Sequence, residues 1–276
     1  MSERQTVPPT GPKKYYIAVD LEGVACVVGS PGRGLLDAPD YPFACRQGTR
    51  EANAAAKALF DAGAEEVWVW DCHGTGVNLD IDALDERVTV VNGSGSRKRF
   101  PGLDASFAGV LFIGYHAYDA PRATLAHVYS SSAFAGMFVN GQPVGELQID
   151  AAVAGRIGVP VLFVSSDDVC VAQAKETFPD AAFVETKKAL AWNSCASKHP
   201  ARVCREIEQT VRALAAHPSG TLFRFSSPFS LVIKYKRMEG AQNASLTNPD
   251  GTPFDRPDPY VRSGRLNDPE DLFRFI

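Results

Sequence analysis

The sequence predicts an α/β fold: a mostly parallel central sheet flanked by helices, with a small α+β carboxyl-terminal part. Short apolar segments alternate with longer segments of helical periodicity, a pattern typical of parallel sheets that helices cover on both faces. Hydrophobic residues make up 45% and charged residues 22% of the 276 residues, as in ordinary globular proteins. After about residue 219 the composition shifts towards proline, asparagine and arginine, which marks the carboxyl-terminal part.

The first strand is predicted at 14–20, where KYYIAVD forms a short run of apolar, β-branched and aromatic residues. A helix of about six turns follows, because Asp40 and Pro42 are typical helix-start residues and small or apolar residues recur at helical spacing up to Gly63. Later segments continue the alternation of strands and helices. Buried strands are predicted at 67–70, 110–115 and 161–164, and helices from Glu146, after Asp168 and across 203–214.

Between 125 and 144 the pattern predicts short strands, the first of which carries His127. Asn140-Gly141 between two apolar runs is a strong signal for a two-residue hairpin turn. The chain then runs directly into the helix that begins at Glu146, so the backbone of this carboxylate is fixed. In the carboxyl-terminal part, a strand is predicted at 230–236 and a proline-rich loop at 248–259.

These elements predict a metal-binding α/β catalytic domain over 14–218 and a small α+β part over 219–276. Lys plus Arg number 28 and Asp plus Glu 32, and the net charge of −4 argues against nucleic acid or an anionic membrane as a partner. The polar stretch 1–14 lacks the apolar core of a signal peptide, so we expect a cytoplasmic protein. The six cysteines form no CxxC pair, and we expect buried thiols rather than disulfides.

Polar side chains follow three of the predicted strands, where parallel sheets bind ligands. Asp20 and Glu22 stand two residues apart, so an extended chain directs both carboxylates to one side. Their mutual repulsion favours a divalent cation between them, whereas the alternative is a solvated corner between strand and loop. Taken alone, this pair of acidic residues favours the solvated corner.

Histidines follow the other two strands, and each alone is ambiguous. In WDCHGTG, His73 is the expected metal ligand, Cys72 the packing residue, and Asp71 a candidate partner of the histidine. His116 and His127 are each compatible with an ordinary core histidine. The combination is more informative: Asp20, Glu22, His73, His116 and Glu146 form a nitrogen and oxygen set suited to one or two zinc-like ions.

A glycine- and serine-rich stretch, NGSGSRKRF, precedes the strand that leads to His116. Arg97, Lys98 and Arg99 beside the glycines suggest a phosphate cradle, but the spacing of a P-loop is missing. We therefore expect a mobile surface loop at this position.

Five ordered motifs resemble those of the zinc-dependent D-aminopeptidase family. They are VDLEG (19–23), WDCHG (70–74), GYHA (114–117), the segment around His127, and NGxxVGE (140–146). The resemblance extends from about Tyr15 to the PEDLFRFI tail and so covers nearly the whole chain. It implies an aminopeptidase with two zinc ions per subunit, which acts on short peptides with D-amino-acid amino termini and assembles into a ring-shaped homo-oligomer.

The resemblance also implies roles for individual residues. Asp20 corresponds to the carboxylate that bridges two metals, and His127 to the catalytic histidine beside them. The remaining ligands would be Glu22, His73, His116 and Glu146.

Two other functions stay open from the sequence. The same metal site would also suit L-peptides or another small amide. A non-catalytic α/β binding domain ranks lower, because Asp20 and Glu22 present anions where a nucleotide-binding fold would hold a pyrophosphate.

Overall fold

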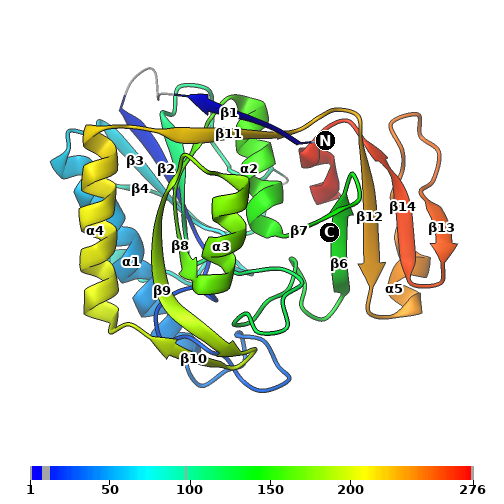
Figure 1. Ribbon diagram of the computed structural model, residues 1–276, viewed down its shortest axis with the longest axis horizontal. Helices are drawn as coiled ribbons and strands as arrows, with labels where there is room; N and C mark the ends of the chain where they lie inside the picture. Colours follow the sequence, from blue (N-terminus) through cyan, green and yellow to red (C-terminus); the bar gives the residue numbers. More distant parts are fainter. Residues whose placement is uncertain (1, 8–12, 97, 275–276) are drawn as a thin grey trace.

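The computed structural model describes residues 2–7, 13–96 and 98–274. Its described part contains a nine-stranded sheet whose central strands run parallel, which confirms the predicted fold class (Figure 1). The parallel strands, in spatial order, are β4 (Thr89–Val91), β3 (Glu66–Asp71), β2 (Lys14–Val19), β5 (Gly109–Ile113), β8 (Val161–Asp167) and β9 (Ala182–Ala191). The antiparallel strands are β10 (Ser194–Ser197) beside β9, β11 (Gly220–Phe225) beside β8, and β1 (Ser2–Val7) beside β11.

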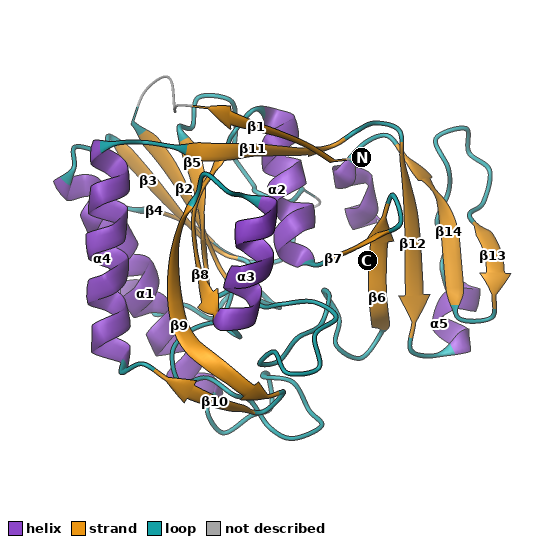
Figure 2. Ribbon diagram, in the orientation of Figure 1, coloured by secondary structure: helices purple, strands orange, loops and turns teal. Residues whose placement is uncertain are grey.

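Helices cover both faces of this sheet (Figure 2). On one face lie α1 (Tyr41–Asp61) and α4 (Pro200–Ala216); on the other lie α2 (Glu146–Ile157) and α3 (Asp168–Thr177). Strand β2 is buried from both sides, and alternate residues enter different clusters: Ile17 packs with the α1 and α4 side, whereas Tyr16 packs with the α2 side. Burial on two faces explains why the strand reads as a continuous apolar run rather than an alternating one.

Helix α1 begins where the sequence predicts, with Pro42 in its first turn. Asp40 occupies the position before the helix, but its side chain does not cap α1. Its carboxylate instead accepts the backbone N–H groups of Val28 and Gly29, at 2.9 and 3.0 Å. The residue thus fixes the segment that connects the first strand to the helix.

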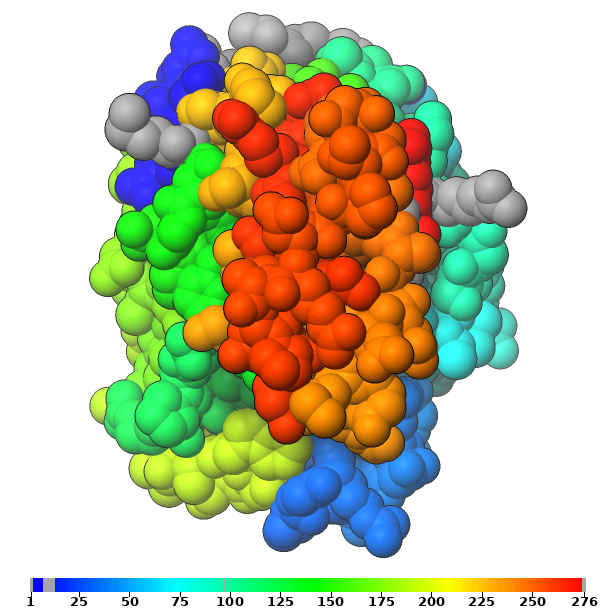
Figure 3. All heavy atoms as spheres, turned by 90° about the vertical axis from the view of Figure 1, so that its right-hand side faces the viewer, coloured from blue at the N-terminus to red at the C-terminus, as the bar shows by residue number. Residues whose placement is uncertain are grey.

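A second sheet of five antiparallel strands packs beside the first, and its three carboxyl-terminal strands belong to the orange and red surface in Figure 3. Asn140 and Gly141 join two of these strands with φ values of 51° and 79°, the left-handed pair that a two-residue hairpin turn requires. The short elements α5 (Met238–Asn243) and η2 (Pro269–Arg274) pack against this sheet. Its strands, in order, are β13 (Asp255–Asp258), β14 (Val261–Leu266), β12 (Phe229–Tyr235), β6 (Phe134–Val139) and β7 (Gln142–Val144).

Strand pairing crosses the predicted domain boundary in both directions. β11 follows residue 219 yet joins the central sheet, whereas β6 and β7 precede it and pair with β12. Each sheet thus contains strands from both predicted parts. The division of the chain into domains 14–218 and 219–276 stays a prediction.

The structure differs from the sequence-based expectations at several places. The predicted loop 248–259 contains strand β13, which pairs with β14. The segment around His127 is a loop, because Leu125 and Tyr129 have φ values of 54° and 50°, which an extended strand excludes. Arg99 is largely buried rather than part of a mobile surface loop, while Arg97 lies outside the described residues. All six cysteines are free, as expected, but only Cys170 is buried; Cys26 is exposed and the other four are half-buried. No helix in the described part is long and apolar enough to cross a membrane.

Candidate metal centre

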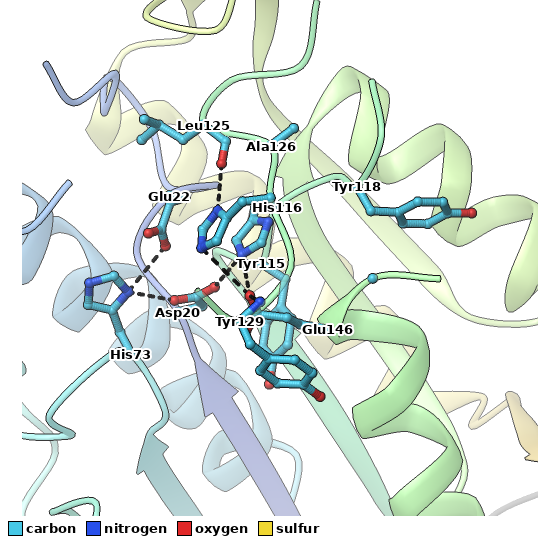
Figure 4. A network of polar contacts seen from close by, with 12 residues as sticks. Asp20, Glu22, His73, Tyr115, His116, Tyr118, Leu125, Ala126, Tyr129 and Glu146 are labelled. Atoms are coloured by element: carbon cyan, nitrogen blue, oxygen red, sulfur yellow. Dashed lines mark hydrogen bonds and ion pairs between the residues drawn. The ribbon is translucent and has the colours of Figure 1, made fainter. Parts of the chain in front are cut away.

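Three neighbouring parallel strands bring the predicted ligands together at their carboxyl ends. β2 lies between β3 and β5, so Asp20, His73 and His116, which follow these strands, converge (Figure 4). The N–H of Asp20 donates to Ile113 O of β5 at 2.8 Å, which holds the start of the ligand loop against the neighbouring strand.

Two glycines allow this close approach of the loops. A Cβ atom at Gly23 would lie 2.0 Å from Tyr115 O, and one at Gly114, whose φ is 72°, would lie 2.1 Å from Asp20 O. No side chain fits at these distances, so the glycines of the VDLEG and GYHA motifs serve the convergence of the strand ends.

The first group of candidate ligands contains Asp20, Glu22 and His73. His73 Nδ1 lies 2.8 Å from Asp20 Oδ1 and 3.2 Å from Glu22 Oε2. All three residues are buried. Each offers one ligand atom within 4.8 Å of the others, a spacing that suits a single metal ion.

The second group contains His116, His127 and Glu146, whose ligand atoms also lie within 4.8 Å of one another. His116 Nε2 is 3.0 Å from Glu146 Oε1, the carboxylate at the start of α2. The His127 ring stacks on the His116 ring with centroids 3.9 Å apart, and its Nε2 lies 3.7 Å from Glu146 Oε1.

Asp20 connects the two groups. Its Oδ1 faces His73, whereas its Oδ2 lies 3.6 Å from His116 Nε2. The five candidate ligands and His127, each predicted from sequence, therefore lie in one cluster with Asp20 at its centre (Figure 4).

The ionisable side chains of the first group are buried together and shift one another's pKa. Burial and the charge of Glu22 raise the pKa of Asp20 to about 7. Burial opposes ionisation of Glu22 as well, but the charge of His73 outweighs it and lowers the pKa of Glu22 well below its usual range. The imidazole of His73 is thus held as a cation between two carboxylates.

The second group behaves in the same way. Burial disfavours the charged form of His116, yet the carboxylate of Glu146 overrides it and raises the pKa of His116 to about 10. Burial likewise works against ionised Glu146, but His116 lowers the pKa of Glu146 to about 2. Burial and the charge of His116 lower the pKa of His127, which is therefore the neutral imidazole of the cluster at pH 7.

The donor chemistry fits zinc. Three carboxylates and two or three imidazoles are the nitrogen and oxygen ligands that zinc prefers. Within the described structure, buried His73 Nε2 has no hydrogen-bond partner, a costly state for a polar atom away from water. A metal ion would satisfy a ligand atom of this kind.

A buried lysine, which the sequence analysis did not single out, stabilises the loop that carries Asp20 and Glu22. Lys187 on β9 is 1% exposed, and its Nζ donates to three carbonyls of the ligand loop: Glu22 O at 2.5 Å, Val24 O at 2.9 Å and Val27 O at 2.6 Å. The lysine thereby fixes the backbone path after Asp20. The sequence does not distinguish Lys187 from its neighbour Lys188, which is exposed on the same strand.

Asp71 has a different role from the predicted one. Its carboxylate contacts no atom of the His73 ring; it accepts the backbone N–H groups of Asn78 and Leu79, at 2.5 and 3.0 Å. The Asn78 side chain then donates to His73 O at 2.6 Å. Asp71 therefore stabilises the loop that carries His73, while Cys72 packs with Sγ 3.1 Å from Val19 O.

A buried ion pair, also missed from the sequence, supports the second group. Arg99 donates twice to Asp150, with Nε 3.0 Å from Oδ1 and a terminal nitrogen 2.6 Å from Oδ2. Asp150 lies one turn after Glu146 on α2 and also accepts a hydrogen bond from Tyr115 at 2.7 Å. Tyr129 links this network to the site, because its N–H donates to Glu146 Oε1 at 2.5 Å.

The cluster lies in a cavity of about 710 Å³. Segment 32–37, which precedes α1, forms part of its wall. Asn193 Nδ2 holds the chain just before this segment by donating to Val28 O at 2.9 Å. The wall also contains Trp192, residues 129–132 and Lys236. The cavity is large enough for a short peptide beside the metal ligands.

Comparison of this chain with known proteins identifies its family. The family model described as D-aminopeptidase matches residues 13–252, most of the chain. The chain belongs to this family. Membership confirms the resemblance that the five motifs predict and makes the protein a metal-dependent aminopeptidase.

Two relatives agree with this family assignment. The D-aminopeptidase of Bacillus subtilis (strain 168) is 35% identical over 210 residues, which cover 73% of each chain. The solved structure of the Zn-dependent D-aminopeptidase DppA from Bacillus subtilis, a self-compartmentalizing protease, superposes with a TM-score of 0.85 at 27% identity. The superposition covers 95% of this chain and 94% of that chain.

Proposed function

We propose that this family member is a dinuclear zinc aminopeptidase that hydrolyses short peptides or amides with D-amino-acid amino termini. The observation that carries the proposal is the position of Asp20, whose two carboxylate oxygens face two separate ligand groups. The zinc dependence of the solved relative supports the choice of metal, and the D-aminopeptidase of Bacillus subtilis supports the substrate class.

In this proposal Glu22 and His73 would hold one ion, His116 and Glu146 would hold the other, and Asp20 would contribute to both. Two zinc ions would acidify a water molecule and polarise the carbonyl of the scissile bond. Burial of the ligands keeps bulk water from weakening these charges.

His127 is assigned the proton transfers. Its Nδ1 donates to Leu125 O at 2.8 Å, which leaves the lone pair on Nε2 and directs that nitrogen towards the cluster. Neutral His127 accepts the proton that the attacking water loses. It then delivers this proton to the amine that leaves as the C–N bond breaks.

Assembly into a ring-shaped homo-oligomer is part of the proposal, supported by the solved relative, a self-compartmentalizing protease. Light scattering tests it directly. A particle of several subunits is expected, and a monomer of 29.7 kDa would contradict it.

The decisive experiment combines zinc content with matched substrates. We expect two zinc ions per chain and faster hydrolysis of D-alanyl-D-alanine than of L-alanyl-L-alanine. Faster hydrolysis of the L-dipeptide would be consistent with the proposed metal site but would contradict the proposed preference for D-peptides. A single zinc ion per chain at full activity would overturn the dinuclear site.

A further inference from the structure

Two hollows of the protein surface meet at a lysine to which the proposed chemistry assigns no role. The site cavity and a second hollow of about 420 Å³ share three lining residues: His127, Trp192 and Lys236. Lys236 follows β12, whose last residue pairs with the first residue of β6, at the lower end of the antiparallel sheet in Figure 1. Lys236 therefore lines both hollows, as His127 does.

The ammonium group of Lys236 is anchored but not neutralised. Its Nζ donates to Ser131 O at 2.6 Å, and its backbone N–H donates to Ala133 O at 2.9 Å. A lysine ammonium has three N–H donors, so two remain available. Within the described structure, no carboxylate forms an ion pair with Lys236.

The neighbouring residues are hydrogen-bonding groups of the kind that bind carboxylates. Ser130, Ser131 and Ser132 line the same cavity, and the hydroxyls of Ser130 and Ser132 lie 3.2 Å apart. An ammonium beside hydroxyl donors recognises an anionic oxygen group by charge-assisted hydrogen bonds.

The metal centre does not need this positive charge. Two zinc ions would already outweigh the negative charge of Asp20, Glu22 and Glu146. Lys236 is exposed, so water solvates its ammonium in the free protein, and the charge is available to an anion that enters the cavity. A short peptide supplies such an anion at its carboxyl terminus.

The distance is suited to short peptides. Tyr129 N lies 2.5 Å from the candidate ligand Glu146, and Ser131 O, two residues later, lies 2.6 Å from Lys236 Nζ. Because one residue spans at most about 3.6 Å, the lysine lies within roughly 15 Å of the ligand, the length of about four extended residues.

We propose that Lys236, with Ser130 and Ser132, binds the carboxyl-terminal carboxylate of the substrate. The inference rests on the proposed aminopeptidase function and narrows its substrate class to short peptides with a free carboxyl terminus. Lys236 is then a specificity-determining residue on the leaving-group side of the scissile bond, beyond His127.

The test compares D-alanyl-D-alanine with its carboxyl-terminal amide, which differs only in the anionic group. We expect the wild-type enzyme to prefer the free acid, and Lys236→Met to lower kcat/KM for the acid by about 10- to 100-fold, the effect of a hydrogen bond to a charged group. The loss should fall mainly on KM, with hydrolysis of the amide unchanged. Lys236→Arg should restore part of the preference, and Lys234→Met, an exposed lysine of the same strand, is the matched control.

Other outcomes separate this inference from the proposed function. Equal losses for acid and amide in Lys236→Met, or no loss for either, would overturn the carboxylate site while leaving the aminopeptidase intact. Loss of acid preference in Arg33→Met alone would assign the carboxylate to the other cation of the cavity and overturn the role of Lys236. A wild-type enzyme that hydrolyses neither substrate would instead contradict the proposed function.

Discussion

The two ligand groups of the centre are built on different kinds of support. Asp20, Glu22 and His73 follow adjacent parallel strands, and Lys187 fixes the loop between them through three carbonyls. In the second group only His116 follows a parallel strand; His127 depends on a loop and Glu146 on the start of α2. Strand ends are positioned by the sheet itself, whereas a loop and a helix start need side-chain partners from elsewhere.

Those partners come from distant parts of the chain. Arg99 holds Asp150 on α2, and its own backbone N–H donates to Glu270 of the carboxyl-terminal η2 at 2.7 Å. The guanidinium also lies over the rings of Trp70 and Phe273. The second group is therefore coupled to the carboxyl-terminal segment through Arg99.

The largest effect is expected at the residue that the groups share. Asp20→Ala removes a ligand from both, so zinc content should fall below one ion per chain, and hydrolysis of D-alanyl-D-alanine should fall by more than roughly 10⁴-fold, the upper range for a single acid–base residue. Metal analysis and steady-state kinetics measure this. Asp82→Ala, an exposed acidic residue, is the control; retention of both zinc ions in Asp20→Ala would refute the bridging role.

His127 tests whether the second group contains a proton carrier or an additional ligand. Its Nε2 lies within ligand range of His116 and Glu146, so the geometry allows both. We expect His127→Ala to keep two zinc ions and to lose turnover by about 10²- to 10⁴-fold. Loss of one zinc ion would make His127 a ligand; the exposed His217→Ala is the control.

Asp150 tests the asymmetry between the groups. Asp150→Asn removes the charge that holds Arg99, and Glu146 one turn away should lose its fixed position. Zinc affinity of the second group should fall by about 10- to 100-fold, as for other partners behind metal ligands, while that of the first group stays unchanged. A two-step zinc titration measures it, with exposed Glu176→Ala as the control. Equal weakening of both steps would mean that the groups share one support.

Glu51 affects the stability of the folded protein rather than the chemistry of the centre. It lies next to the loop that carries the first ligand group. It accepts the N–H of Ala25 at 3.0 Å, and burial raises the pKa of Glu51 to about 7 from 4.5. Because the folded state binds this proton more tightly, its stabilisation is complete below pH 4.5 and is lost as the pH rises through about 7. The loss amounts to about 3 kcal/mol at 1.36 kcal/mol per pKa unit.

The measurement is urea unfolding of the zinc-free protein between pH 5 and pH 8. Glu51→Gln cannot ionise, so its stability relative to the wild type should increase across this range. Glu65→Gln, an exposed residue, should show no such trend. A parallel pH profile for wild type and Glu51→Gln would show that Glu51 is ionised in the folded protein.

Local patterns were sufficient to predict much of the fold and the residues of the centre. The apolar run of β2 and the helix-start signals before α1 depend on neighbours in the sequence, as does the Asn140-Gly141 turn. The loop around His127 was predicted as a strand because its apolar alternation gives no sign of the left-handed residues Leu125 and Tyr129.

The sequence by itself determined which side chains are available as ligands, since five spaced motifs place carboxylates and imidazoles at the ends of strands. Only the tertiary structure decided how Asp20 is shared between two groups and which residues support each group. Lys187, Arg99 and Lys236 meet their partners across separations that no local pattern encodes. Spacing along the chain records periodicity, whereas contacts between distant segments depend on how the sheets and loops pack.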